Sequence, residues 1–167
     1  MVPDLKLNKY SDLTADYLLG IGVSALILDI DNTLVPYEIP EPTAENLAWL
    51  TLMHENGIKT AFVSNNHKER VELYNQSLGC PAFPDSGKPF KKACKRALEA
   101  MEIAPSEAAI IGDQVFTDVL CGRNAKLKLA ILVKPIKDKT NLFFMMVLRK
   151  NKYRIICFKF SCFMYLS

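Results

Sequence analysis

The sequence predicts an α/β fold, in which helices cover both faces of a central, mainly parallel sheet of five strands. Apolar runs of strand length alternate with segments of helical period, as they do in βαβ units. The run SALILDI at residues 24–30 is almost continuously apolar, which is typical of a strand buried on both faces. Two of the predicted helices end at a glycine, Gly57 and Gly79, a common helix terminator.

Each element is predicted from its own pattern, in chain order. In the first helix, Leu47, Leu50 and Met53 lie on one stripe. Pro89 suits the first turn of the third helix, where its missing N–H costs no hydrogen bond. The strands are predicted at residues 24–30, 59–64, 81–83, 107–112 and 128–133. The helices are predicted at residues 44–57, 66–79, 89–101, 114–125 and 140–150.

Length and composition indicate one domain. The chain has 167 residues, of which 50% are hydrophobic and 23% charged, the profile of a globular domain with a sizeable core. We expect this domain at residues 1–150, followed by a basic, apolar tail at 151–167. Five cysteines without a CxxC pair favour a reduced protein. No signal peptide or membrane-spanning run is recognisable, so the expected location is the cytoplasm.

Positive charge is concentrated near the C-terminal end. Residues 142–167 carry five basic side chains and no acidic one, whereas the rest of the chain is slightly acidic. Because these cations alternate with apolar residues, one interpretation is peripheral contact with an anionic membrane surface. The alternative is a last helix or strand packed on the core with solvated lysines. The acidic body, without a basic stripe interleaved with aromatic residues, argues against a nucleic-acid partner.

Polar side chains follow three of the predicted strands at the point where each strand ends. Asp29 and Asp31 end the first strand, Ser64 ends the second and Asp113 ends the fourth. In open α/β sheets, ligands bind just outside the carboxyl ends of the strands. The sequence therefore predicts one polar binding site at this edge of the sheet.

Four short motifs carry a resemblance to a known family. They are DIDNT at 29–33, VSNN at 63–66, GKP at 87–89 and GDQVFTD at 112–118. In order and spacing they resemble motifs one to four of the haloacid dehalogenase (HAD) superfamily of phosphohydrolases, most closely its small capless branch of YqeG-like proteins. The resemblance spans about residues 20–135 and implies a Rossmann-like HAD fold and a phosphatase.

A phosphatase of this kind needs a cation. A phosphomonoester carries about two negative charges near neutral pH, so a carboxylate nucleophile can approach only if that charge is screened. Mg²⁺ suits this task because it prefers hard oxygen ligands and keeps several waters. Asp29 and Asp113 are the candidate side-chain ligands. The resemblance adds the backbone carbonyl of Asp31, and Asp118 as a direct ligand or an acceptor for the metal's waters.

The catalytic roles divide between two aspartates. Asp29 is the predicted nucleophile, which forms an aspartyl-phosphate. Asp31 lies on the same face of the strand and is the predicted general acid, then base. Backbone and side-chain donors are expected to hold the phosphoryl oxygens, and a threonine to support the phosphate loop. These phosphate-binding residues are Thr33, Ser64, Asn65 and Lys88.

Every candidate residue also has a structural alternative. Asp29 and Asp31 could cap a turn, Ser64 could cap a helix, Lys88 could be a surface lysine and Asp118 could be solvated. Together these alternatives leave unexplained why four polar motifs occur in order along one sheet edge.

A different functional class is a HAD-shaped phosphate-binding or assembly module without turnover. The intact Asp29 argues against it.

The spacing between the motifs indicates how much of the site can be covered, and therefore which substrates can reach it. Asp31 lies 33 residues before Ser64, and Ser64 lies 24 residues before Lys88, gaps too short for an inserted cap domain. We therefore expect an open site with only a short flap at residues 36–43. The resemblance implies a lipid phosphate such as phosphatidylglycerophosphate, and a soluble phosphate monoester or a phosphorylated macromolecule suits an open site equally well. An oligomer is compatible with the sequence.

Overall fold

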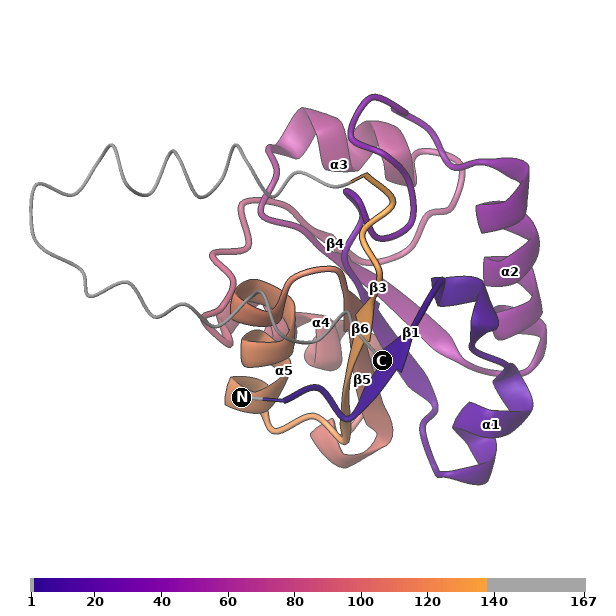
Figure 1. Cartoon of the computed structure of the whole chain (residues 1–167), viewed down its shortest axis with the longest axis vertical. Helices are drawn as coiled ribbons and strands as arrows, with labels where there is room; N and C mark the ends of the chain where they lie inside the picture. Colours follow the sequence, from indigo (N-terminus) through magenta and orange to yellow (C-terminus); the bar gives the residue numbers. More distant parts are fainter. Residues whose placement is uncertain (1, 138–167) are drawn as a thin grey trace, which may run out of the picture. The chain divides into compact units, whose positions relative to one another are not determined.

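The computed structural model describes residues 2–137, which fold around a six-stranded parallel sheet (Figure 1). The strand order is β1-β6-β5-β2-β3-β4. The strands are β1 (Leu5–Leu7), β2 (Ala25–Leu28), β3 (Lys59–Val63), β4 (Ala82–Phe83), β5 (Ala108–Gly112) and β6 (Leu129–Val133). The α-helices are α1 (Ala15–Gly20), α2 (Ala44–Glu55), α3 (Lys68–Asn75), α4 (Lys92–Met101) and α5 (Leu120–Ala125). Shorter helical turns are η1 (Tyr10–Asp12), η2 (Pro105–Glu107) and the π-helical η3 (Val115–Val119).

The predicted α/β class is confirmed, with one strand more than the five expected. The additional strand, β1, pairs with β6 at the edge of the sheet, where Leu5 aligns with Ile131 and Leu7 with Val133. Its three residues read Leu-Lys-Leu, which is too short a pattern to indicate a strand without its partner. Helix α1, which follows it, was also absent from the sequence-based expectation.

The sheet separates two apolar layers, because successive residues of a strand point to opposite faces. In β2, which is buried throughout, Leu26 and Leu28 pack in the core formed with α1, α2 and α3. Ala25 and Ile27 pack in the second core, formed with α4 and α5. Figure 1 shows these two groups of helices on opposite faces of the sheet. Near-continuous apolarity of β2 is therefore the consequence of burial on both faces.

The chain reverses its direction across the sheet between β2 and β5. From β2 it proceeds through α2 to β3 and through α3 to β4, then crosses by α4 to β5 on the other side of β2. Leu28 of β2 aligns with Ile111 of β5, so the residues that follow the two strands lie next to each other. The edge of the sheet at the carboxyl ends of β2 and β5 is therefore a topological switch point. Ligands of open α/β sheets bind at such a point.

Several boundaries differ from the sequence-based expectation. Helix α4 begins at Lys92, so Pro89 precedes the helix and does not lie in its first turn. The helix predicted over 114–125 consists of a π-helical turn followed by α5. The helix predicted at 140–150 and the tail at 151–167 lie outside the described residues. The domain boundary at residue 150 therefore stays a prediction.

The segment between β2 and α2 bears on access to the switch point. It runs over residues 29–43 and contains turns, with no helix or strand of its own. Within residues 2–137, no folded domain is inserted after β2 or after β3, in keeping with the expected absence of a cap. Among the same residues, no helix is long and apolar enough to cross a membrane.

Candidate active site

Three carboxylates gather at the switch point of the sheet. Asp29 follows β2, Asp113 follows β5, and Asp118 lies in η3, the turn that comes next in the chain. One carboxylate oxygen from each lies within 4.8 Å of the others. Asp29 and Asp118 are buried, and Asp113 is partly buried. The structure thus brings together the three side chains predicted as metal ligands.

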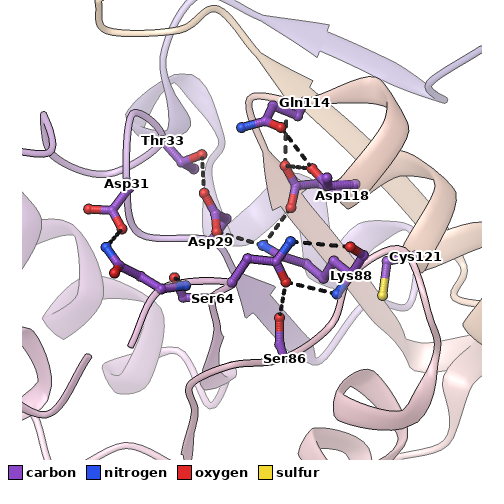
Figure 2. Close-up of polar contacts among 12 residues, drawn as sticks. Asp29, Asp31, Thr33, Ser64, Ser86, Lys88, Gln114, Asp118 and Cys121 are labelled. Atoms are coloured by element: carbon purple, nitrogen blue, oxygen red, sulfur yellow. Dashed lines mark hydrogen bonds and ion pairs between the residues drawn. The ribbon is translucent and has the colours of Figure 1, made fainter. Parts of the chain in front are cut away.

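Lys88 supplies the positive charge of this cluster. Its Nζ lies 2.5 Å from Oδ1 of Asp29 and 2.6 Å from Oδ1 of Asp118. Figure 2 shows Lys88 between these two aspartates. The Lys88 side chain is only 2% exposed, so the alternative of a surface lysine is wrong. Asp118 is 1% exposed and is likewise not a solvated helix residue. Both charges are buried because they neutralise each other.

The local sequence explains how Asp118 reaches the cluster. Oδ2 of Asp118 accepts a hydrogen bond from the backbone N–H of Gln114 at 3.1 Å, which fixes the carboxylate over the start of η3. Gly112, the last residue of β5, makes room for it, because a Cβ there would lie 2.2 Å from Cγ of Asp118. The glycine of the fourth motif is therefore a packing requirement of the site.

The electrostatics show an excess of negative charge. Burial raises the pKa of Asp29 to about 7, although Lys88 opposes the shift. Burial and the neighbouring Asp118 raise the pKa of Asp113 to about 6. Burial alone would lower the pKa of Lys88, but Asp118 and Asp29 raise it above its ordinary value. Burial and the neighbouring carboxylates thus raise the pKa values of Asp29 and Asp113, whereas the pKa of Lys88 is raised by the two carboxylates against the effect of burial.

The residues of the cluster fit a divalent cation. When all are ionised, three carboxylates and one ammonium leave a net charge of −2. Oδ1 of Asp113 is buried and accepts no hydrogen bond from the described residues, so a buried acceptor lacks its partner. Carboxylate oxygens without histidine or thiolate are the donor set that Mg²⁺ prefers.

The remaining predicted residues support this cluster or lie beside it. Oγ1 of Thr33 donates to Oδ2 of Asp29 at 3.1 Å, so it holds the second oxygen of the carboxylate. Ser64 is 2% exposed, and its Oγ accepts the N–H of Asn66 at 3.1 Å, which caps a turn before α3. The helix itself has His67 as N-cap, so Ser64 is not its cap.

Asn65 fastens the loop that carries Lys88. Its Oδ1 accepts hydrogen bonds from the Lys88 backbone N–H and from Oγ of Ser86, both at 2.8 Å. Its Nδ2 donates to the Lys88 carbonyl at 3.2 Å. The side chain of Asn65 therefore aligns the lysine, and binding of phosphate by its backbone N–H stays a prediction.

The carboxylate of Asp31 lies outside the cluster of three. Its Oδ2 accepts from Nδ2 of Asn66 at 2.8 Å, and its Oδ1 accepts from Arg70. Neither Asn66 nor Arg70 was among the predicted site residues. Arg70 had no recognisable signal, because an arginine in a charged helix is ordinarily a solvated residue.

Comparison with known proteins agrees with this geometry. Residues 86–140 match a family model described as HAD-hydrolase-like. The chain is 38% identical over 135 residues to the probable phosphatase YqeG of Bacillus subtilis (strain 168), a match that covers 81% of this chain and 78% of the relative.

Two solved structures share the fold. An uncharacterized protein from Listeria monocytogenes serotype 4b has a TM-score of 0.51 at 17% identity, covering 75% of this chain and 98% of that one. An uncharacterized protein from Corynebacterium glutamicum ATCC 13032 has a TM-score of 0.50 at 16% identity, covering 75% and 93% of the two chains. With the YqeG match over most of both sequences, the chain belongs to the HAD-like hydrolases and is a phosphatase of that family.

Proposed function

We propose that this phosphatase is a Mg²⁺-dependent phosphomonoester hydrolase that forms an aspartyl-phosphate on Asp29. The observation that carries the proposal is the environment of the Asp29 carboxylate. Lys88 holds its Oδ1 at 2.5 Å and Thr33 its Oδ2 at 3.1 Å, while the carboxylates of Asp113 and Asp118 lie beside it. A buried carboxylate held in one orientation next to an ammonium group is suited to attack on an anionic ester.

The reaction has two steps. In the first, an Asp29 oxygen bonds to phosphorus while the bond to the leaving oxygen breaks, and Asp31 gives that oxygen its proton. In the second, Asp31 takes a proton from the water that attacks phosphorus, which releases phosphate and restores the Asp29 carboxylate. Mg²⁺, held by Asp29, Asp113 and the Asp31 carbonyl with Asp118 beside them, would neutralise charge on the phosphoryl group.

Lys88 and the end of β3 provide the phosphate-binding donors. Lys88 is already aligned by two carboxylates, so its ammonium is fixed before the substrate arrives. Ser64 and the backbone N–H of Asn65 follow β3 at the same edge of the sheet. Donors fixed in advance stabilise the charge that develops on the phosphoryl oxygens without reorganising during the reaction.

A lipid phosphate is the substrate class that we favour. Phe90 and Phe116 are 74% and 78% exposed, and they follow Lys88 by two residues and Asp113 by three. Large exposed apolar side chains that follow site residues closely in sequence suit a substrate with an apolar portion. In residues 2–137 no cap domain lies over the site, so a substrate embedded in a lipid surface, such as phosphatidylglycerophosphate, has access.

The test of the reaction is hydrolysis of 4-nitrophenyl phosphate with and without Mg²⁺. We expect Mg²⁺-dependent turnover that Asp29→Asn abolishes and that Asp16→Asn, a change in the exposed first turn of α1, leaves intact. Acid quenching with labelled substrate should trap phosphate on the wild-type chain and none on Asp29→Asn. Binding of phosphate without turnover by the wild type would instead favour the binding or assembly module.

The test of the substrate class compares phosphatidylglycerophosphate in mixed micelles with glycerol 3-phosphate. We expect a higher kcat/KM for the lipid, and we expect Phe90→Ser together with Phe116→Ser to lower it for the lipid only. Equal values for both substrates would favour a soluble phosphate monoester. A phosphorylated macromolecule becomes the favoured substrate if neither compound is hydrolysed while the aryl phosphate is.

A further inference from the structure

Arg70 of α3 makes contacts that the reaction above does not use. Its Nε and Nη2 donate to Oδ1 of Asp31 at 3.2 and 2.9 Å. Nη2 also donates to the carbonyl of Ile39 at 2.9 Å, and Nη1 donates to the carbonyl of Pro40 at 2.7 Å. The guanidinium carbon lies 5.7 Å from the centre of the Tyr74 ring. The Arg70 side chain is 12% exposed, so it is partly buried.

These contacts fix the orientation of the Asp31 carboxylate. A carboxylate oxygen has two lone pairs, and Oδ1 of Asp31 uses both for the two N–H groups of Arg70. Oδ2 accepts one hydrogen bond, from Asn66 at 2.8 Å, and keeps one lone pair. A proton carried by Asp31 is therefore placed on Oδ2. Without Arg70 the carboxylate could rotate and present either oxygen.

The same guanidinium holds the flap at residues 36–43, which contains Ile39 and Pro40. Of its four hydrogen bonds, two go to Asp31 and two to these carbonyls. Arginine suits this position because its five N–H donors lie in a rigid plane and here make four hydrogen bonds to three acceptors, whereas an ammonium has only three donors on a flexible chain. The flap and the carboxylate are thus joined through one side chain.

We propose that Arg70 is a positioning residue that orients the general acid Asp31 and couples it to the flap. The inference rests on the proposed role of Asp31. Arg70 acts through Asp31 and does not touch the substrate. When the flap is displaced, Arg70 loses its two hydrogen bonds to the carbonyls of Ile39 and Pro40 and keeps only those to Asp31, so the guanidinium is free to turn and proton transfer is efficient only while the flap is in place.

The dependence on the leaving group provides the test. 4-Nitrophenolate leaves as a stable anion and needs little protonation, whereas the alkoxide of glycerol 3-phosphate needs a proton as it departs. We expect Arg70→Met to lower the rate of phosphoryl transfer to Asp29, measured in a single turnover, on the order of 10²-fold for the alkyl phosphate and by less than about 3-fold for the aryl phosphate, as for loss of a general acid. The single-turnover measurement is needed because the second step, in which Asp31 acts as the base, is common to both substrates. The half-saturating substrate concentration should change little. Asp31→Asn should give the same pattern for this first step.

Two further variants separate positioning from folding. Arg123→Met removes another ion-paired arginine, which contacts Asp4 at 2.6 Å in a more exposed position, and should leave both activities unchanged. Arg70→Lys keeps the charge but not the planar set of donors, and its loss on the alkyl phosphate should fall between those of the wild type and Arg70→Met. Full activity of Arg70→Lys would overturn the proposal, since charge alone would then suffice.

Proteolysis tests the coupling to the flap. A glutamate-specific protease can cleave after Glu38, which lies in the flap and is followed by Ile39. Arg70→Met should be cleaved there faster, on the order of 5-fold for each net hydrogen bond lost, while Asp31→Asn keeps the two carbonyl contacts and should be cleaved at the wild-type rate. Equal cleavage of Arg70→Met and wild type would refute the coupling.

The outcomes distinguish this inference from the proposed function. Turnover that survives Asp29→Asn means that the proposed reaction is wrong. If Asp29→Asn is inactive and Asp31→Asn shows the leaving-group pattern, but Arg70→Met lowers both activities equally, only the role of Arg70 is wrong.

Discussion

Gly112→Ala tests whether the packing of Asp118 against β5 is essential to the site. The new Cβ would lie 2.2 Å from Cγ and 2.4 Å from Oδ2 of Asp118, far inside contact distance. Asp118 cannot simply rotate away, because Lys88 holds it at 2.6 Å and the N–H of Gln114 at 3.1 Å. We expect an overpacking cost of about 1–3 kcal/mol. Loss of a hydrogen bond to a charged group adds about 1.5–3 kcal/mol.

The measurement is the free energy of unfolding by urea, with turnover of 4-nitrophenyl phosphate measured in parallel. We expect Gly112→Ala to lose roughly 3–5 kcal/mol of stability and most of its activity. Gly20→Ala is the matched control, because a Cβ there meets no atom within 4 Å. It should leave turnover unchanged and alter stability by no more than about 1 kcal/mol.

A double-mutant cycle assigns the cause. In an Asp118→Gly background the clash is gone, so Gly112→Ala should cost little there if Asp118 is the obstacle. A Gly112→Ala protein with wild-type stability and turnover would refute the argument, as would an equal cost in both backgrounds. The second result would place the strain in the strand and not in the site.

Two other predictions concern the charge of the cluster. Lys88→Met leaves the carboxylates without their ammonium, and we expect loss of turnover and a cost of about 3–5 kcal/mol in unfolding free energy without metal. The cost should be smaller with Mg²⁺, and a cost that Mg²⁺ does not change would contradict this reasoning. Folding raises the pKa of Asp29 from 3.8 to about 7, so its contribution to stability is complete below pH 4 and is lost as pH rises towards 7. In metal-free urea titrations, the wild type should therefore lose stability relative to Asp29→Asn between pH 4 and 7, by at most about 4 kcal/mol. A difference in unfolding free energy between the two proteins that stays constant over this pH range would show that the pKa of Asp29 is not raised.

Much of the site was predictable because a parallel sheet places the ends of its strands at one edge. Once β2, β3 and β5 were recognised from their apolar runs, Asp29, Ser64 and Asp113 had to lie near one another. The α/β class followed from the same alternation of apolar runs and helical segments. These features depend on local pattern, so the sequence by itself determined them.

Other features depend on contacts between distant parts of the chain. Strand β1 forms only because Leu5–Leu7 pairs with β6, which lies more than a hundred residues later in the chain. The burial of Lys88 between Asp29 and Asp118 joins residues from three separate segments. From the sequence alone, Arg70 is expected to be a solvated helix residue, but the fold places its side chain in contact with Asp31. The tertiary structure decided these partners, since the free energy of burying a charge depends on which groups surround it and not on its neighbours in sequence.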